Sequence, residues 1–308
     1  MVVLGVDIGG TKIRMGIIDS DGQVVADHVV PTQVPLYPFL EENVLELIEK
    51  YPQIQAIGIG TRGMVDAENG VITFETETLP GWQGTEVKSL LEKATGLRVE
   101  VNNDANCAGL AEARLGAAKG FRRTVCLTVG TGLGGGIVLD GQILNGAHGG
   151  GGEVGHLILY PNGHVCTCGR PGCSEQYVSG TALRRQIEER QILDDNQQLI
   201  SPHQLFGMAN AGHVEAMSLT KKFTSDLAIV ISSLQAVLDM DCVVIGGGVS
   251  ESANEWWHYL EEALEPLLLK PLTVKKAQFR NEAGMLGAAL LVIDHVNESA
   301  SKNIEDVR

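Results

Sequence analysis

The chain has 308 residues, of which 44% are hydrophobic and 20% are charged, and its formal net charge at pH 7 is −15. This length fits one large domain or two ordinary ones, and the balance of apolar and charged residues excludes a disordered chain. The acidic charge argues against a general nucleic-acid-binding protein, which needs a basic face to neutralise phosphates.

The amino terminus and the hydropathy of the chain bear on its location. The first residues, MVVLGVDIGGTK, lack the basic stretch and long apolar segment of a signal peptide, and no run of about 18 apolar residues predicts a transmembrane helix. We therefore expect a cytoplasmic protein without a membrane partner. In that reducing compartment, clustered cysteines bind a metal more often than they form disulfides.

The first part of the chain alternates between predicted strands and helices. An apolar strand within residues 2–10 ends in a glycine turn, and residues 13–30 form two further strands around an Asp-Gly turn. Helical spacing of apolar residues predicts helices over 39–51, 85–96 and 105–116, and apolar runs predict strands within 54–66 and 97–104.

The pattern then restarts. Residues 124–144, TVCLTVGTGLGGGIVLDGQIL, repeat the strand, glycine turn, strand and DGQ sequence of residues 2–25. This internal repeat predicts a duplicated domain with a cleft between its halves. Helices between about 180 and 240, a buried strand within 242–248 and a helix over 254–269 complete the second half.

The first glycine turn, DIGGTK, is a candidate phosphate-binding loop. Gly9 and Gly10 let backbone amides approach a phosphate, while Thr11 and Lys12 offer a hydroxyl and a cation. Asp7 at the strand end is placed to hold Mg²⁺ through water. The alternative is a hairpin turn without a ligand.

The second glycine turn matches the dinucleotide-binding pattern G-x-G-x-x-G at Gly130, Gly132 and Gly135, and residues 58–63 match it as well. That fingerprint requires a helix directly after the loop, whereas a strand follows here. We therefore exclude NAD and expect a phosphate-binding hairpin. A third glycine loop, residues 244–250, follows a buried strand, and either covers a nucleotide's base and ribose or serves packing alone.

Two segments carry candidate carboxylates. Asp104 lies at a strand end before a helix, where it is either a helix N-cap or a general base that accepts a proton from an attacking alcohol, with Asn103 binding the substrate. Glu153 and His156 follow four glycines, a pattern typical of a loop that a ligand approaches closely. The alternative there is a flexible turn followed by a strand.

Three cysteines lie within eight residues, at Cys166, Cys168 and Cys173, with the density of a zinc knuckle. A closed tetrahedral site needs a fourth ligand, and the spacing does not choose among His148, His156 and His164. The alternative is three reduced, buried thiols. Glu175 follows two residues after the last of these cysteines, so a metal would hold it firmly.

Taken together, these motifs resemble the ROK family (repressor, open reading frame, kinase) of bacterial sugar kinases and sugar-sensing regulators. The resemblance covers residues 3–292 and rests, in the family's order, on DIGGTK, NNDANC, GTGLGGGIV, GGEVGH, CTCGRPGCSE and VIGGGVS. It implies an α/β fold of the actin-like ATPase-domain (ribonuclease H-like) type. The two lobes would span residues 1–118 and 119–283, with a C-terminal helix over about 284–308 packing back on the first.

The resemblance also implies roles for individual residues. Asp104 would be the catalytic base, and zinc would be held structurally by His156, Cys166, Cys168 and Cys173. The sugar would be bound by Gly63, Asn103, Asp104, Glu153, His156 and Glu175. ATP and Mg²⁺ would be bound by Asp7, Gly9, Gly10, Thr11, Lys12, Gly130, Thr131, Gly132 and Gly247.

The function implied is an ATP-dependent hexose 6-kinase, with glucose as the first candidate substrate and N-acetylmannosamine or N-acetylglucosamine as alternatives. A sugar sensor or transcriptional repressor is the hypothesis from another class, and an N-terminal DNA-binding segment would have only six residues before Asp7. Arg62 stands where the family usually has proline, which leaves the preferred sugar open. A homodimer or homotetramer is implied by the resemblance alone.

Overall fold

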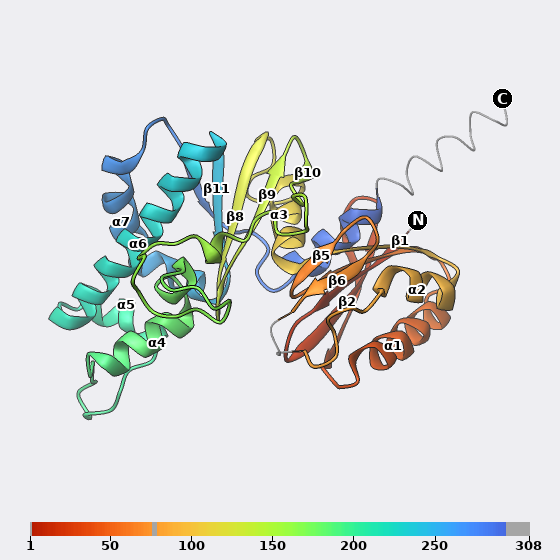
Figure 1. The fold of residues 1–308 in the computed structure, drawn as a ribbon, viewed down its shortest axis with the longest axis horizontal. Helices are drawn as coiled ribbons and strands as arrows, with labels where there is room; N and C mark the ends of the chain where they lie inside the picture. The colour runs from red at the N-terminus through yellow and green to blue at the C-terminus, as the bar shows by residue number, and fades with distance from the viewer. Residues whose placement is uncertain (1, 76–78, 294–308) are drawn as a thin grey trace. The chain divides into compact units, whose positions relative to one another are not determined.

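The computed structural model describes residues 2–75 and 79–293, and the chain divides into two compact units (Figure 1). The first unit comprises Met1–Leu115, Gly141–Gly151 and Asn281–Arg308, and the second comprises Gly116–Asp140 and Gly152–Arg280. The predicted C-terminal helix is helical over 283–293, while its continuation to 308 lies outside the described residues.

The first unit is built on a mixed sheet in the order β3-β2-β1-β4-β7. Its strands are β1 (Val2–Ile8), β2 (Lys12–Asp19), β3 (Val24–Pro31), β4 (Ile54–Thr61) and β7 (Arg98–Asn103), with a small hairpin of β5 (Met64–Asp66) and β6 (Val71–Phe74). Its helices include α1 (Leu36–Lys50), α2 (Val87–Thr95) and α3 (Asp104–Arg114), and the short strand β10 (Gln142–Ile143) lies in its second segment.

In the second unit, β9 (Leu133–Leu139), β8 (Arg123–Val129), β11 (Cys242–Gly246) and β12 (Thr273–Lys276) are neighbours in that order. Four α-helices accompany them: α4 (Gly180–Glu189), α5 (Pro202–Asn210), α6 (Val214–Leu238) and α7 (Ala253–Leu264). Short 3₁₀ turns lie at η1 (Val154–His156), η2 (Ser174–Gln176), η3 (Gly248–Ser252) and η4 (Glu265–Leu267).

The strand topology confirms the internal repeat. In the first unit β1 pairs antiparallel with β2 and parallel with β4, and in the second unit β8 pairs antiparallel with β9 and parallel with β11. The two predicted glycine turns therefore occupy equivalent positions: the first joins β1 to β2, and the second joins β8 to β9. The parallel strands of each sheet end at one edge, where loops gather ligand-binding groups.

Two positions in the first sheet, Gly5 and Gly58, have room only for glycine because the helix over 283–293 packs against them. A Cβ on Gly58 would lie 1.7 Å from the carbonyl oxygen of Ala288, and one on Gly5 would lie 2.3 Å from that of Met285. The helix backbone thus rests directly on β1 and β4, which only residues without a side chain permit. This helix belongs to the first unit although it comes last in the sequence.

Aromatic packing explains the Trp-containing helix of the second unit. Trp256 on α7 is buried, and its ring centroid lies 5.8 Å from that of Phe223 on α6 and 6.0 Å from that of Phe206 on α5. The predicted helix ends at Leu264, because the chain passes into a 3₁₀ turn at Pro266. Trp256, Leu260 and Leu264 of α7 are all buried in the core of the second unit.

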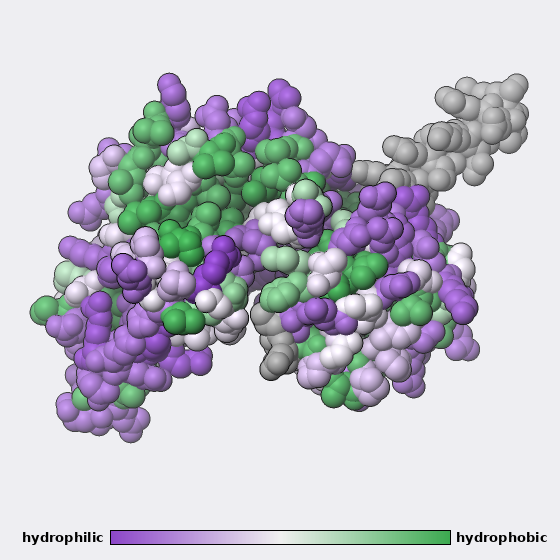
Figure 2. Space-filling view, in the orientation of Figure 1, coloured by the Kyte–Doolittle hydropathy of each residue, from purple (hydrophilic) through white to green (hydrophobic). Residues whose placement is uncertain are grey.

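In the view of Figure 2, a hydrophobic area lies over α6 and α7 of the second unit. Exposed apolar side chains in this part of the second unit include Ile229, Val237 and Leu269. Among residues 2–75 and 79–293, no helix combines the length and apolar character that crossing a bilayer requires.

Candidate functional site

The first glycine loop is a tight hairpin between β1 and β2. The amide of Gly9 donates to the carbonyl of Lys12 (3.0 Å), and Thr32 holds the loop from β3 through hydrogen bonds to Gly9 and Thr11. The amides of Gly10 and Thr11 have no hydrogen-bond partner among the described residues. Successive backbone amides without a partner, held in a fixed hairpin, can bind an anion.

Asn103, and not Asp104, caps helix α3. The Asn103 side-chain oxygen accepts hydrogen bonds from the amides of Ala105 and Asn106, and its Nδ2 donates to the carbonyl of Gly63 (3.0 Å). Asp104 is therefore released from the capping role that its position suggested. Asn103 retains one further N–H for a ligand, because Nδ2 carries two donors.

Gly63 fits the loop that Asn103 holds. Its φ of 94° lies in the left-handed region, and a Cβ there would meet the carbonyl oxygen of Phe74 at 2.4 Å. Glycine alone satisfies both conditions. The contact with Asn103 places Gly63 beside the start of α3, so two predicted sugar ligands of the first unit lie together.

Asp7 and Asp104 form a carboxylate pair in the first unit. The pKa of Asp7 is raised to about 7, mainly because burial desolvates the carboxylate and secondly because the charge of Asp104 repels it. Desolvation also raises the pKa of Asp104, while the amide of Ala105 and the charge of Arg62 lower it in part. A Cβ on Gly284 would lie 2.7 Å from the Asp7 carboxylate, so only a glycine leaves room for the carboxylate here.

This pair fits a divalent cation. Mg²⁺ binds proteins through one or two carboxylates and retains several waters. A cation would also relieve the repulsion that raises the pKa of Asp7. Lys12 and Arg14 lower the pKa of Asp7 in part, and Arg14 is already paired with Asp27 and Glu282.

The second glycine loop has a similar form in the second unit. The amide of Gly130 donates to the carbonyl of Gly132 (3.0 Å), whereas the amides of Thr131 and Gly132 have no partner within the described chain. Gly247, at φ 86°, packs against the end of β8, where a Cβ would lie 2.5 Å from the carbonyl oxygen of Val129. The predicted phosphate loop and the predicted nucleoside loop are therefore neighbours.

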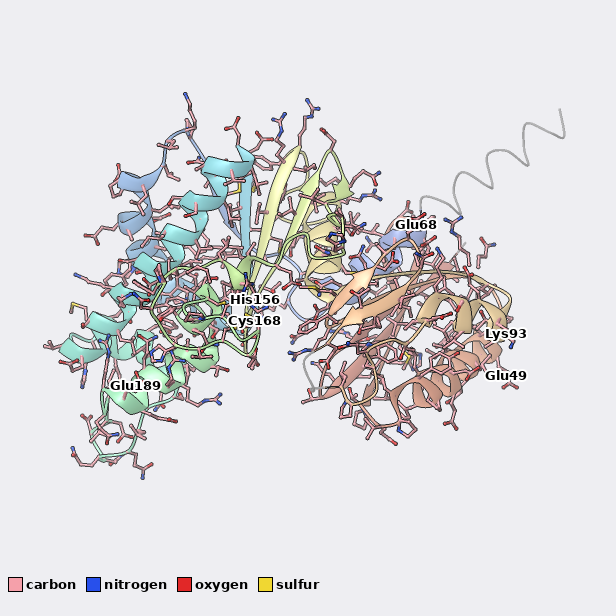
Figure 3. The ribbon with its side chains drawn as sticks, in the orientation of Figure 1. Glu49, Glu68, Lys93, His156, Cys168 and Glu189 are labelled. Atoms are coloured by element: carbon pink, nitrogen blue, oxygen red, sulfur yellow. The ribbon has the colours of Figure 1, made fainter. Side chains whose placement is uncertain are left out.

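Four predicted metal ligands converge in the second unit. The donor atoms of His156, Cys166, Cys168 and Cys173 all lie within 4.8 Å of one another, and Figure 3 shows His156 beside Cys168. The distance from His156 Nδ1 to Cys166 Sγ is 3.7 Å, and that from Cys168 Sγ to Cys173 Sγ is 3.6 Å. Ligands of tetrahedral zinc are about 3.8 Å apart when each lies about 2.3 Å from the metal. The donor set and its spacing therefore fit zinc.

The structure selects His156 from the three histidines that the spacing left open. His164 instead packs against the ring of Tyr177, with centroids 5.7 Å apart. Nε2 of His156 lies 3.7 Å from a carboxylate oxygen of Glu153, at the other end of η1. The Glu153 carboxylate thus lies near Nε2, whereas Nδ1 is the nitrogen that lies near Cys166.

Glu175 lies between the cysteine cluster and the second glycine loop. Its Oε2 accepts a hydrogen bond from the amide of Leu133 (3.2 Å), and its Oε1 lies 4.0 Å from Cys166 Sγ. Ser174 is buried, and its hydroxyl donates to the carbonyl of Val154 (2.7 Å), which joins η2 to η1. Glu153, His156 and Glu175 are thereby held in one framework.

Sequence reasoning missed the positioning role of Ser174, because a single serine carries no periodic or spacing signal.

The strand register shows that Arg62 lies near the start of α3, which its position in a loop of the sequence did not predict. Thr61 pairs with Asn103 across β4 and β7, so Arg62 and Asp104 are the next residues along two adjacent parallel strands. The side chain of Arg62 has no hydrogen-bond or ion-pair partner among the described residues.

Comparison with known proteins places this geometry in a family. The sequence model of the ROK family matches residues 3–295. The chain belongs to the ROK family. The resemblance inferred from the motifs is thus confirmed, and with it the actin-like fold, since solved ROK kinases share the architecture over nearly the whole chain.

Among curated ROK relatives, the chain is 31% identical to a glucokinase from Thermotoga maritima, covering 96% of this chain and 98% of that protein. It is 32% identical to an N-acetylmannosamine kinase from Salmonella typhi, covering 94% and 98%. The ROK hexokinase from Thermus thermophilus superposes with a TM-score of 0.85 at 38% identity, covering 97% and 100%. A Streptomyces griseus glucokinase in complex with glucose and AMPPNP superposes with a TM-score of 0.79 at 30% identity, covering 94% and 99%.

Proposed function

We propose that this ROK protein is an ATP-dependent sugar kinase that phosphorylates the 6-hydroxyl of a hexose, with glucose as the first candidate. The observation that carries the proposal is the state of Asp104. Its carboxylate follows β7, leaves the N-cap position of α3 to Asn103, accepts the amide of Ala105 through Oδ1 (2.8 Å), and has a raised pKa. A base of this kind suits an alcohol that must lose a proton as it attacks a phosphoryl group.

In the proposed reaction, the sugar oxygen attacks the γ-phosphorus of ATP while its proton passes to a carboxylate oxygen of Asp104. The new oxygen–phosphorus bond forms as the bond from the γ-phosphorus to the bridging oxygen breaks, and ADP leaves with that electron pair. The outward amides of Gly10, Thr11, Thr131 and Gly132 bind phosphate oxygens, Lys12 supplies a cation, and Gly247 lies near the adenosine. Asp7 would hold Mg²⁺, which neutralises phosphate charge.

Gly63, Asn103, Glu153, His156 and Glu175 bind the sugar hydroxyls in this proposal. Zinc would be held by His156, Cys166, Cys168 and Cys173, and four protein ligands leave it no open position for chemistry. The zinc would hold the loop that carries these sugar ligands. The zinc site is supported by the four donor atoms, which all lie within 4.8 Å of one another.

N-acetylmannosamine is the alternative substrate, and a relative with that activity at 32% identity supports it. A cytoplasmic location, where ATP is available, belongs to the same proposal. Assembly as a homodimer or homotetramer stays a prediction, and the exposed apolar side chains of Ile229 and Val237 on α6 support it.

An ADP-release assay tests the function across glucose, mannose, fructose, allose, N-acetylglucosamine and N-acetylmannosamine. We expect the highest kcat/KM with glucose, and a fall in kcat of about 10²–10⁴-fold for Asp104→Asn with the fold retained. No turnover with any of the sugars would favour the sensor hypothesis. Near-normal turnover by Asp104→Asn would show that another group is the base.

A further inference from the structure

Glu175 makes contacts that binding a sugar does not require. Its Oε2 accepts the amide of Leu133, the residue that closes the Gly130–Gly132 loop, at 3.2 Å. A Cβ on Gly132 would lie 2.2 Å from this same oxygen, so the loop has glycine where the carboxylate reaches it. Glu175 thus supports the loop from within the second unit.

The backbone after Glu175 follows the same loop. The amide of Gly180 donates to the carbonyl of Gly130 (2.7 Å), and the amide of Thr181 donates to that of Thr131 (3.3 Å). Ser179 fixes this stretch, because its hydroxyl donates to the carbonyl of Glu175 (2.8 Å) and caps helix α4. The start of α4 and the Glu175 side chain therefore both hold the Gly130–Leu133 loop through hydrogen bonds.

The other side of Glu175 is fixed to the cysteine cluster. Cys173 lies two residues earlier, and the intervening Ser174 is anchored through its amide to Leu157 (2.7 Å) and through its hydroxyl to Val154. Oε1 of Glu175 lies 4.0 Å from the Cys166 sulfur. A displacement of the cluster would therefore displace the side chain that holds Leu133.

We propose that Glu175 is a positioning residue that couples the His156–Cys166–Cys168–Cys173 cluster to the Gly130–Leu133 loop, so that metal in the cluster sets the affinity for nucleotide phosphates. The proposal rests on the proposed function, because it takes this loop to bind the phosphates of ATP and ADP. It adds to the predicted contact between Glu175 and sugar. A role in sugar binding alone leaves nucleotide affinity unchanged when sugar is absent.

The charge of Glu175 and its hydrogen bond to Leu133 have opposite effects on the affinity for phosphate. A negative charge beside a phosphate loop disfavours an anion, whereas a hydrogen bond that holds Leu133 favours the bound geometry. Glu175→Gln keeps an acceptor oxygen and removes the charge, so it retains the support. Glu175→Ala removes the acceptor.

The test is ADP binding to the full chain by titration calorimetry, with Mg²⁺ and without sugar. We expect Glu175→Ala to weaken ADP binding by about 10-fold, as the loss of the hydrogen bond to the Leu133 amide predicts, and Glu175→Gln to stay within about 2-fold of wild type. Glu188→Ala is the matched control, because Glu188 is an exposed glutamate on α4, the helix that follows η2, and this variant should bind ADP as wild type does.

Metal dependence is measured on the wild-type chain, which avoids any variant that fails to fold. Removing zinc with a chelator should weaken ADP binding by a similar factor, and adding zinc back should restore it, with metal content followed by elemental analysis. The chelator should have little further effect on Glu175→Ala, because the coupling is already lost.

Two results would overturn the coupling: wild-type ADP affinity in Glu175→Ala, or zinc loss that leaves ADP affinity unchanged. A wild-type chain that retains no zinc after purification in its presence would also overturn it. A wild-type chain that binds zinc but no ADP would instead contradict the kinase function, and the coupling would fail with it.

Discussion

At the residue scale, neighbours decide which of two chemically reasonable roles a side chain takes. Asp104 and Asn103 are both good N-cap residues, yet the side chain of Asn103 reaches the amides of Ala105 and Asn106. Asp104 is then available for proton transfer, and its pKa reflects desolvation opposed by Arg62. The residue that departs from the family's usual proline thus acts on the predicted base.

Replacing Arg62 with glutamine should shift the pH dependence of the reaction. The charge of Arg62 lowers the pKa of Asp104, so its removal should raise that pKa further. Because the base must be ionised, the acid limb of the kcat/KM profile should move to higher pH, and activity should be lost as the pH falls through the raised pKa.

Arg62→Lys keeps a positive charge and serves as the control, with an acid limb close to that of wild type. The measurement is kcat/KM between about pH 5 and pH 9, at a fixed sugar and at constant ionic strength. A profile for Arg62→Gln that coincides with the wild-type profile would show that Arg62 does not act on the base.

At the element scale, glycines decide how closely a helix approaches a sheet. The helix over 283–293 places the carbonyl of Ala288 where a side chain on Gly58 of β4 would have to lie. The atom in the way belongs to the helix backbone, which cannot turn aside as a flexible side chain can. Close packing of helix and sheet therefore depends on this position.

Gly58→Ala should reduce the free energy of unfolding by about 3 kcal/mol, since overpacking against backbone forces the helix away from the sheet. Gly248→Ala is the comparison, because a Cβ there meets nothing within 4 Å and its φ is not left-handed. That variant should stay within about 0.5 kcal/mol of wild type. Urea denaturation measures both, and equal stabilities for the two variants would contradict the packing argument.

At the scale of the whole molecule, one supersecondary pattern occurs twice. Both units place an antiparallel glycine hairpin beside parallel strands, and both hairpins contain two successive amides without a partner among the described residues. Around these two sheets the chain carries 38 acidic and 23 basic residues. Anion binding in this protein is therefore a local property of loop amides and not of its overall charge.

The overall charge predicts that the chain binds nucleic acid weakly. With a formal net charge of −15, the chain should not retard a duplex DNA fragment at physiological salt, even at about 10 μM protein. A gel-shift titration with and without glucose measures this. A retarded band that depends on sugar would revive the regulator hypothesis, whereas a single positive result at low salt would reflect non-specific attraction.

The sequence determined the elements and their chemistry because those depend on local patterns. Apolar periodicity, the repeated hairpin and the Cys166-x-Cys168-x₄-Cys173 spacing predicted strands, duplication and a metal cluster, and the motif set identified the family. The spacing left open the fourth ligand, which the family resemblance assigned to His156, and local patterns left open the capping of α3 and the role of Ser174. Those depend on contacts between residues distant in the chain, such as His156 with Cys166 and Glu175 with Leu133. Only the folded chain brings these groups together, so the tertiary structure alone decided the cap of α3 and the contacts of Ser174, and it agrees with His156 as the fourth ligand.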